Sequence, residues 1–179
     1  MESMNFGNLT IARPGTKVSG AGYPELITGT GMNKFTLNGQ ASALMNLATG
    51  NTISILVNPE ATSINDMYFL TEGIAGNESK LASVNKAEGV GRVLNFNYSG
   101  VYSRMLQGTT DAVELSPEGL VNKGLATKRT TEGGNSSYTA LKRYSFRVSE
   151  GVEVEVNGTE MVVYPLVDAK EVDYEVTED

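Results

Sequence analysis

Hydrophobic and polar positions change their period within one stretch of the chain, Asn33–Val57. Phe35 and Leu37 alternate with polar neighbours, which is the two-residue period of a strand with one covered face. Apolar residues then recur three and four positions apart, as on one face of a helix: Ala41, Leu44, Met45 and Ala48. β-Branched and apolar residues fill Thr52–Val57, which predicts another strand. The stretch therefore predicts a strand–helix–strand unit around which the rest of the chain is organised.

The ends of this helix are marked by residues with suitable local chemistry. Asn38 can cap its start, because the side-chain oxygen can accept a hydrogen bond from a free amide of the first turn. Gly50 is placed to end it in a left-handed conformation. No charged residue lies between Lys34 and Glu60, so the helix is expected to be covered on most sides. With Phe69 from a strand at 67–71 and Leu106 from a later helical stretch, the predicted core consists of Phe35, Leu37, Leu44, Met45, Ile53, Ile55, Phe69 and Leu106.

A second stretch, Leu94–Leu115, follows the same pattern in degenerate form. Phe96 and Tyr98 alternate like the first strand, Ser99 stands where Asn38 caps the first helix, and Gly108 is placed to end a shorter helix. Residues 112–115 would supply the following strand. The alternatives are a true repeat and a chance recurrence of a short unit.

The pattern L-N-x-x-A-x-x-L-M-x-L-x-x-G-x-x-I-x-I-L, over residues 37–56, resembles the β-α-β unit of AbrB-like and double-psi barrel proteins. In that family the glycine is usually followed by an acidic residue, and basic residues lie near the start of the unit. Here Asn51 follows Gly50 and only Lys34 precedes the helix, so the resemblance implies no DNA binding by these residues.

The C-terminal half carries a polar, basic stretch. Ser116 and Pro117 form a helix start, with serine as cap and proline at the first helical position. Residues 125–148 then predict two strands around a Gly-Gly-Asn-Ser-Ser tip, with basic pairs on both legs and aromatic residues between them. Six basic residues against Glu132 give +5 over the arm, residues 123–147. The candidate binding residues are Lys128, Arg129, Tyr138, Lys142, Arg143, Tyr144 and Arg147.

The end of the chain is acidic. Valines alternate with glutamates over 152–156, and Asn157-Gly158 predicts a type I′ turn into a strand at 159–164, which Pro165 would end. Nine acidic residues against one basic give −8 over 151–179. We therefore expect one β-rich domain over 1–165 and an acidic tail over 166–179. If arm and tail meet, we expect a salt-sensitive, mainly electrostatic contact.

Composition narrows the fold and the chemistry. Twenty glycines against five prolines indicate many turns and an α+β, β-rich fold: an antiparallel sheet or barrel with two short strand–helix–strand units and C-terminal hairpins. The chain has no cysteine and no histidine, which removes disulfides, thiolate nucleophiles and the commonest general base. The remaining acids are scattered, so we expect no enzyme, metal or cofactor. With no signal peptide and no long apolar run, we expect no membrane partner and a place in the cytoplasm or in a virion.

Two functions remain open. The first is a structural protein that self-associates, or joins other subunits, in a phage virion or similar particle, since the Gly/Asn/Thr-rich composition resembles that of many phage-derived proteins. The alternative is binding of single-stranded nucleic acid by the basic arm, whose aromatic rings could stack on bases, under regulation by the acidic tail.

Overall fold

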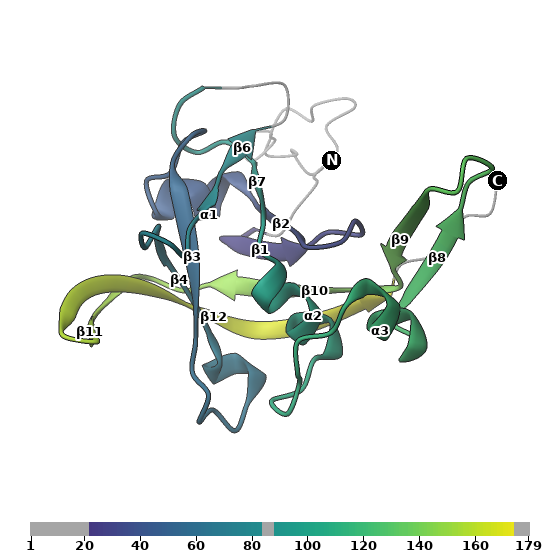
Figure 1. Ribbon diagram of the computed structural model, residues 1–179. Coiled ribbons are helices and arrows are strands. Elements are labelled where there is room, and N and C mark those ends of the chain that lie inside the picture. Colours follow the sequence, from purple (N-terminus) through teal and green to yellow (C-terminus); the bar gives the residue numbers. More distant parts are fainter. Residues whose placement is uncertain (1–21, 84–87, 174–179) are drawn as a thin grey trace, which may run out of the picture.

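The computed structural model describes residues 22–83 and 88–173, which form a β-rich fold with few helices (Figure 1). Antiparallel strands make a nearly closed, barrel-like sheet, as the sequence predicted, and a separate hairpin forms a small second sheet. The strands are β1 (Glu25–Thr28), β2 (Lys34–Leu37), β3 (Thr52–Val57), β4 (Tyr68–Glu72), β5 (Ser79–Lys80), β6 (Ala82–Ser83), β7 (Leu94–Asn97), β8 (Ala126–Thr130), β9 (Ser136–Ala140), β10 (Lys142–Val148), β11 (Val152–Val156) and β12 (Thr159–Asp173). The helices are α1 (Gly39–Leu44), the 3-10 turn η2 (Ile64–Asp66), α2 (Ser99–Gln107) and α3 (Pro117–Asn122).

The large sheet nearly closes because its two ends come from successive strands. Its order is β5-β3-β4-β12-β10-β1-β2-β7-β6, and only Leu81 separates β5 from β6. β5 pairs with β3, and β6 pairs with β7. Leu81 is 1% exposed and donates its amide to the carbonyl of Asn51 at 2.8 Å. The chain thus passes from one end of the sheet to the other within a few residues.

Aromatic side chains fill much of the interior. Phe35 and Phe96 face each other across the β2–β7 pair, with stacked rings 5.2 Å apart, and Tyr102 of α2 meets Phe35 edge-on at 5.7 Å. The predicted core is confirmed for Phe35, Leu37, Met45, Ile53, Ile55 and Leu106. It is wrong for Leu44 and Phe69, which are only partly buried. In β4 the neighbours of Phe69 point to the opposite face, and those neighbours, Tyr68 and Leu70, fill the core.

The first strand–helix–strand unit forms, but its helix is shorter than predicted. Asn38 caps α1 as expected: its side-chain oxygen accepts from the Ala41 amide at 2.9 Å. The helix ends at Leu44 rather than near Gly50, because Asn46 takes a left-handed conformation (φ 55°) and turns the chain. Gly50 (φ 93°) lies in the turn before β3.

The second unit forms only in part. Gly108 (φ 64°) ends α2 in the left-handed conformation, as predicted. The N-cap residue is Tyr98, one position before the expected Ser99, and it makes no side-chain cap bond. Residues 112–115 form no strand, because side chains of α2 bind their backbone: the Leu115 amide donates to Ser103 Oγ at 2.9 Å. The strands of the two units, β2 and β7, pair directly with each other.

The hairpin at 152–164 is confirmed, with Val156 opposite Thr159 and positive φ at Asn157 and Gly158. The prediction that Pro165 ends the second strand is wrong, because β12 runs on to Asp173. Proline is tolerated where β12 exchanges partners: Pro165 lies opposite Phe69 of β4, and the next residue already pairs with β10.

β12 bends where it runs along β10. Two residues, Asp168 and Ala169, oppose the single residue Phe146, which makes a β-bulge. Asp168 takes φ 51°, and the Ala169 amide, displaced from the ladder, donates to Asn65 Oδ1 at 2.9 Å. Residues 166–173 of the segment predicted as an acidic tail therefore belong to the sheet, and 174–179 lie outside the described residues. No helix within the described ranges is long and apolar enough to cross a membrane.

Candidate interaction site: two projecting hairpins

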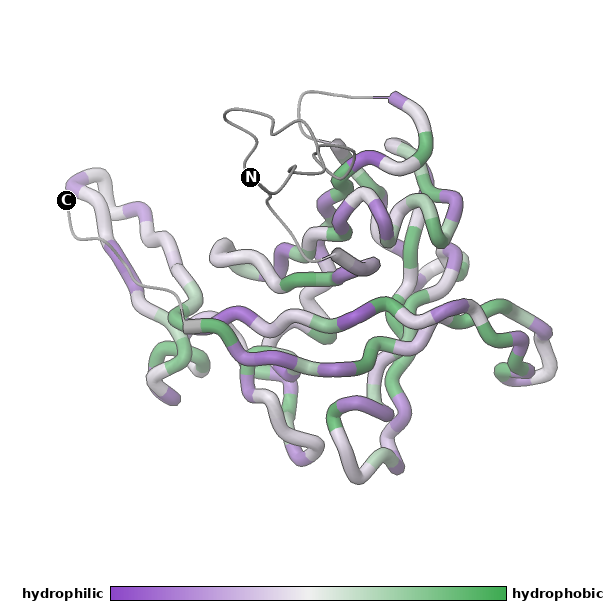
Figure 2. Tube along the Cα trace, turned by 180° about the vertical axis from the view of Figure 1, so that it is seen from behind, coloured by the Kyte–Doolittle hydropathy of each residue, from purple (hydrophilic) through white to green (hydrophobic). Residues whose placement is uncertain are grey.

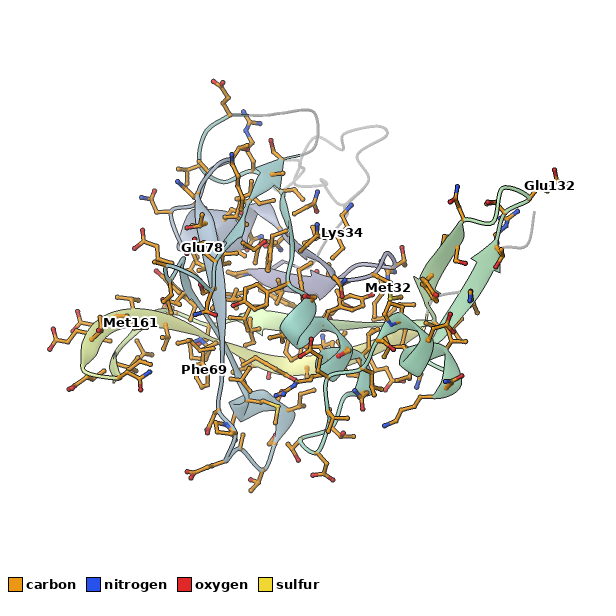
Figure 3. The ribbon with its side chains drawn as sticks, viewed as in Figure 1. Met32, Lys34, Phe69, Glu78, Glu132 and Met161 are labelled. Atoms are coloured by element: carbon orange, nitrogen blue, oxygen red, sulfur yellow. The ribbon has the colours of Figure 1, made fainter. Side chains whose placement is uncertain are left out.

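Two hairpins extend from opposite ends of the long β10–β12 ribbon (Figure 1). One consists of β8 and β9, the other of β11 and the first half of β12. Figure 3 shows how far apart their ends lie, with Glu132 at the tip of the first hairpin and Met161 on the second. These two elements are the parts of the described chain that reach furthest from the barrel, which makes them accessible to a partner.

The β8–β9 hairpin holds three of the seven predicted binding residues. Lys128 and Arg129 lie on β8, and Tyr138 lies on β9 directly opposite Lys128. Residues 127–130 are all exposed. The tip turns at Gly134 (φ 80°), within the predicted Gly-Gly-Asn-Ser-Ser segment.

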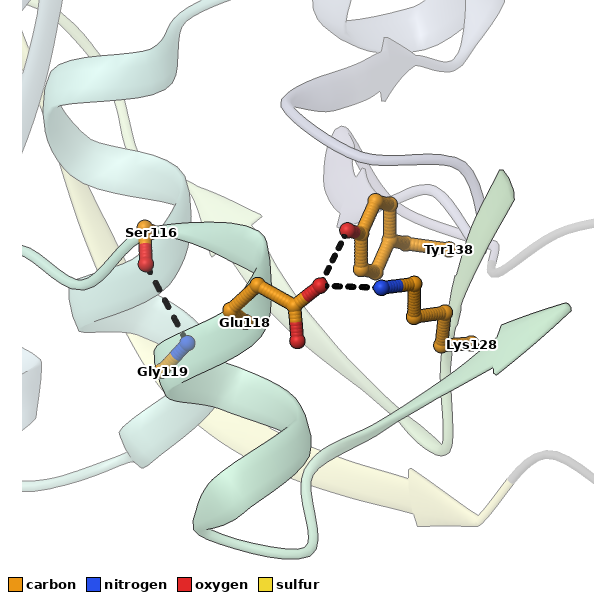
Figure 4. A network of polar contacts seen from close by, with 5 residues as sticks. All are labelled: Ser116, Glu118, Gly119, Lys128 and Tyr138. Carbon is orange, nitrogen blue, oxygen red and sulfur yellow. Dashed lines mark hydrogen bonds and ion pairs between the residues drawn. The ribbon is translucent and has the colours of Figure 1, made fainter. Parts of the chain in front are cut away.

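A carboxylate of α3 joins this hairpin to the helix at its base (Figure 4). Glu118 Oε1 accepts from Lys128 Nζ at 2.6 Å and from the Tyr138 hydroxyl at 2.7 Å. Ser116 caps α3 as predicted and accepts from the Gly119 amide at 3.2 Å, which places Glu118 in the first turn. The hydrogen bonds from Lys128 and then from Tyr138 lower the pKa of Glu118, and the bond to Glu118 raises the pKa of Lys128. Sequence reasoning missed Glu118, although its place after a capping serine was visible.

The other four predicted residues lie elsewhere, which corrects the predicted arm. Residues 142–148 form β10, which returns into the barrel instead of continuing the hairpin. Lys142, Arg143, Tyr144 and Arg147 are therefore part of the main sheet. The hairpin strand β9 ends at Ala140, whose amide donates to the carbonyl of Thr30 at 2.9 Å and so joins the base of the hairpin to the barrel.

The β10 residues meet the segment that was predicted as a tail. Lys142 Nζ lies 2.6 Å from Glu171 Oε1, and the Tyr144 hydroxyl donates to Glu171 Oε2 at 2.9 Å. Arg147 lies 4.0 Å from a carboxylate oxygen of Asp168. Burial first, and then Glu171, raises the pKa of Tyr144 to about 12.

The contact between these basic and acidic residues is not mainly electrostatic. β10 and β12 pair as antiparallel strands from Lys142 opposite Asp173 to Val148 opposite Leu166. The ion pairs therefore only add to a ladder of backbone hydrogen bonds between β10 and β12. Salt alone should not separate the two strands. This corrects the expectation of a salt-sensitive contact between a free arm and a free tail.

The β11–β12 hairpin has the opposite charge. It carries exposed carboxylates at Glu153, Glu155 and Glu160, and no lysine or arginine occurs between positions 148 and 169. Among the described residues no ion pair involves these three glutamates. Val152 is 51% exposed and Val162 41% exposed, so apolar and acidic positions alternate on the surface (Figure 2). Sequence analysis assigned this hairpin correctly but did not identify it as a candidate site.

An open groove of about 880 Å³ lies between this hairpin and strands β3 and β4. Its apolar lining includes Ile55, Val57, Ile74, Met161 and Tyr164. Within the described residues, no group of three or more acidic side chains is arranged to hold a metal ion. The apolar side chains that line the groove offer a surface for apolar contact.

No protein-family model matches the chain, and the searches of curated proteins and of solved structures find no significant match either.

Proposed function

We propose that this chain is a non-enzymatic structural subunit that self-associates, as a component of a virion or another particle. The observation that supports this best is the pair of projecting hairpins, each of which has an outer strand that pairs on one side only among the described strands. An unpaired strand edge is a template for pairing with another chain. The exposed side chains of these hairpins add little to the core of their own chain, which leaves them available for contact with a neighbouring subunit.

The chemistry of the side chains supports the same proposal. The chain has neither histidine nor cysteine, and the buried tyrosines are held in their neutral form: burial raises the pKa of Tyr68 to about 12 and raises that of Tyr102 further. A general base poised near neutral pH would need a different environment. Assembly requires only shape, charge and free backbone groups, which the two hairpins supply.

Binding of single-stranded nucleic acid is the second candidate. It is favoured by the exposed Lys128 and Arg129 beside the ring of Tyr138 on a projecting hairpin. It is weakened because Glu118 engages both Lys128 and Tyr138, and because the other basic residues lie on β10. The net charge of −7 also opposes attraction of a phosphate backbone.

Size-exclusion chromatography with light scattering separates the two candidates. We expect the average mass to rise above that of a single chain as the concentration increases, and to be unchanged by a single-stranded oligonucleotide. A single-chain mass at every concentration would contradict self-association. Co-elution of the oligonucleotide would favour the second candidate.

In that second case the structure supplies a matched pair of variants. Lys128→Ser/Arg129→Ser removes two charges from the projecting hairpin, and Lys142→Ser/Arg143→Ser removes two from β10. Oligonucleotide binding through the hairpin would be weakened by the first variant and spared by the second.

A further inference from the structure

We propose that copies of this chain join head to tail, with the acidic face of the β11–β12 hairpin on one copy docking on a basic outer face of the main sheet on the next. This inference rests on the proposed self-association. It specifies the partner, which is a second copy, and the two surfaces that meet.

The first surface is one face of the β11–β12 hairpin. Glu155 lies opposite Glu160, and directly opposed residues of two paired strands point to the same side of a sheet. Glu153 lies two positions before Glu155 and opposite Val162, so it points to that side too. This acidic face therefore holds three carboxylates beside a valine that is 41% exposed. A shallow hollow of about 370 Å³ lies among these side chains.

The second surface is the outer face of the main sheet. Phe146 of β10 fills the core, so the residues on either side of it point outward. Ser145 lies opposite Lys170 of β12 on one side and opposite Ile27 of β1 on the other. Thr36 of β2 continues this row, because it lies opposite Ile27. Side chains of four adjacent strands therefore share one outer face, together with the residues two positions away along each strand.

Cations predominate on this basic face. It carries four cations and, at its rim, two carboxylates, which makes +2 in a chain of net charge −7: Lys34, Arg143, Arg147 and Lys170 with Glu25 and Asp168. Arg147 lies 5.0 Å from the centre of the Tyr23 ring and Lys170 lies 5.6 Å from it. Burial raises the pKa of Glu25, while the nearby charges of Lys170 and Arg143 act to lower it, which agrees with their place on one face.

The two faces complement each other in charge and in shape. A lysine side chain can pack its hydrocarbon stem on Val162 and place its ammonium group among the three carboxylates of the hollow. Lys34 and Lys170 are both exposed, and neither forms an ion pair with a described carboxylate. Val172, 39% exposed beside them, adds an apolar contact.

Charge also selects a second copy as the partner. Two acidic faces would repel each other, since like charges brought together at an interface are unfavourable. The net charge of −7 opposes a nucleic acid on the basic face. The acidic hairpin of another copy meets neither obstacle, and it gives the three unpaired carboxylates their partners.

The position of the two faces determines the kind of assembly. Lys34 lies on the barrel, away from Met161 on the hairpin, so the two faces of one chain do not meet (Figure 3). Contact between two different surfaces of the same subunit is heterologous and gives an open chain or a closed ring. Since the contact is mainly between surface charges, it should weaken as salt shortens the Debye length from about 10 Å at 0.1 M to about 3 Å at 1 M.

Charge reversal on each face tests the contact by light scattering. The variant Glu153→Lys/Glu155→Lys makes the hairpin basic, and Lys34→Glu/Lys170→Glu makes the sheet face acidic. Each variant alone should have the mass of a single chain where the wild type associates, because like charges would meet at the contact. An equimolar mixture should recover the wild-type mass, since every hairpin then finds a sheet face of opposite charge.

Two control variants change the net charge by the same amount away from both faces. Glu60→Lys/Glu114→Lys matches the hairpin variant, and Lys80→Glu/Arg92→Glu matches the sheet variant, all at exposed positions. Both controls should associate like the wild type. Loss of association in the controls as well would show that net charge, and not the proposed contact, governs assembly.

Circular dichroism melts establish that each variant is folded. If a reversed variant does not fold, the neutral variants Glu153→Gln/Glu155→Gln and Lys34→Gln/Lys170→Gln test the same contact. Each of them should associate more weakly than the wild type.

The outcomes separate this inference from the proposed function. If both reversed variants associate as the wild type does, self-association stands and the contact between the two faces is wrong. If each variant is a single chain but the mixture does not associate, the pairing of these two faces is wrong as well. If a single-stranded oligonucleotide binds the wild type but not the sheet variant, the basic face binds nucleic acid and the inference is overturned. If the wild type is a single chain at every concentration, the proposed function fails and the inference fails with it.

Discussion

A substitution at Gly108 would test how the end of α2 packs against Tyr144 of β10. It ends α2 with φ 64°, and its amide donates to the carbonyl of Met105 at 3.0 Å. A Cβ added at this position would overlap the hydroxyl of Tyr144, which donates to Glu171 of β12. Gly108→Ala therefore combines left-handed strain with a steric overlap inside the structure.

The left-handed strain and the steric overlap each lower the free energy of unfolding by an amount that can be measured separately. Left-handed backbone costs a residue with a Cβ about 1–2 kcal/mol, and overpacking typically costs about 1–3 kcal/mol. Gly108→Ala should therefore lower the free energy of unfolding by about 2–5 kcal/mol. Gly124→Ala is the matched control: Gly124 follows α3 with φ 73°, and nothing lies within 4 Å of an added Cβ. The control should lose only about 1–2 kcal/mol.

Urea unfolding followed by circular dichroism measures both losses, with stability extrapolated to water. Adding Tyr144→Phe removes the nearest overlapping atom, so a double-mutant cycle with Gly108→Ala should show a favourable coupling between the two changes. Equal losses for Gly108→Ala and Gly124→Ala, or a cycle with no coupling, would refute the packing of α2 against Tyr144.

Three further expectations follow from burial and charge. Leu37→Ala, at a site with no exposure, should cost about 2–5 kcal/mol in thermal or urea unfolding, and Leu44→Ala should cost clearly less because Leu44 is partly buried; equal costs would contradict the assigned core. Gly158→Val should disturb the β11–β12 turn through its positive φ (81°), seen as faster amide exchange in that hairpin while the core amides keep their protection. The hydrogen bond from Lys142, and then that from Tyr144, lowers the pKa of Glu171, so its contribution to stability is present above the ordinary glutamate pKa of about 4.3 and is lost as the pH falls below it. Glu171→Gln should flatten that acid dependence, and an unchanged pH profile would contradict the contact.

The structure changed the predicted set of binding residues more than it changed the predicted fold class. The basic residues at 128–129 and 142–143 fit one continuous hairpin in the sequence, because both pairs lie in strand-like stretches on either side of a glycine-rich tip. The structure separates them, since the β9 strand ends at Ala140 and the next strand enters the barrel. Glu118, which engages Lys128, could not be assigned as its partner because its position depends on how α3 packs against β8.

What the sequence by itself determined is local. The Asn38 cap, the Ser116 cap, the glycine end of α2 and the turn at Asn157-Gly158 each depend on side chains and backbone preferences within a few residues. The alternation of apolar residues likewise determined most of the buried strand positions. These features follow from short-range chemistry that is already present in the order of the amino acids.

Only the tertiary structure decided which strands pair. β12 continues past Pro165 because its second half completes the barrel beside β10. This pairing gains backbone hydrogen bonds and burial, which the local preference of proline to end a strand does not take into account. The same pairing turned residues 166–173 from a predicted acidic tail into sheet, and placed two hairpins of unlike character at opposite ends of one ribbon. Strand partners far apart in sequence are chosen by closure of the whole sheet, so no local pattern could specify them.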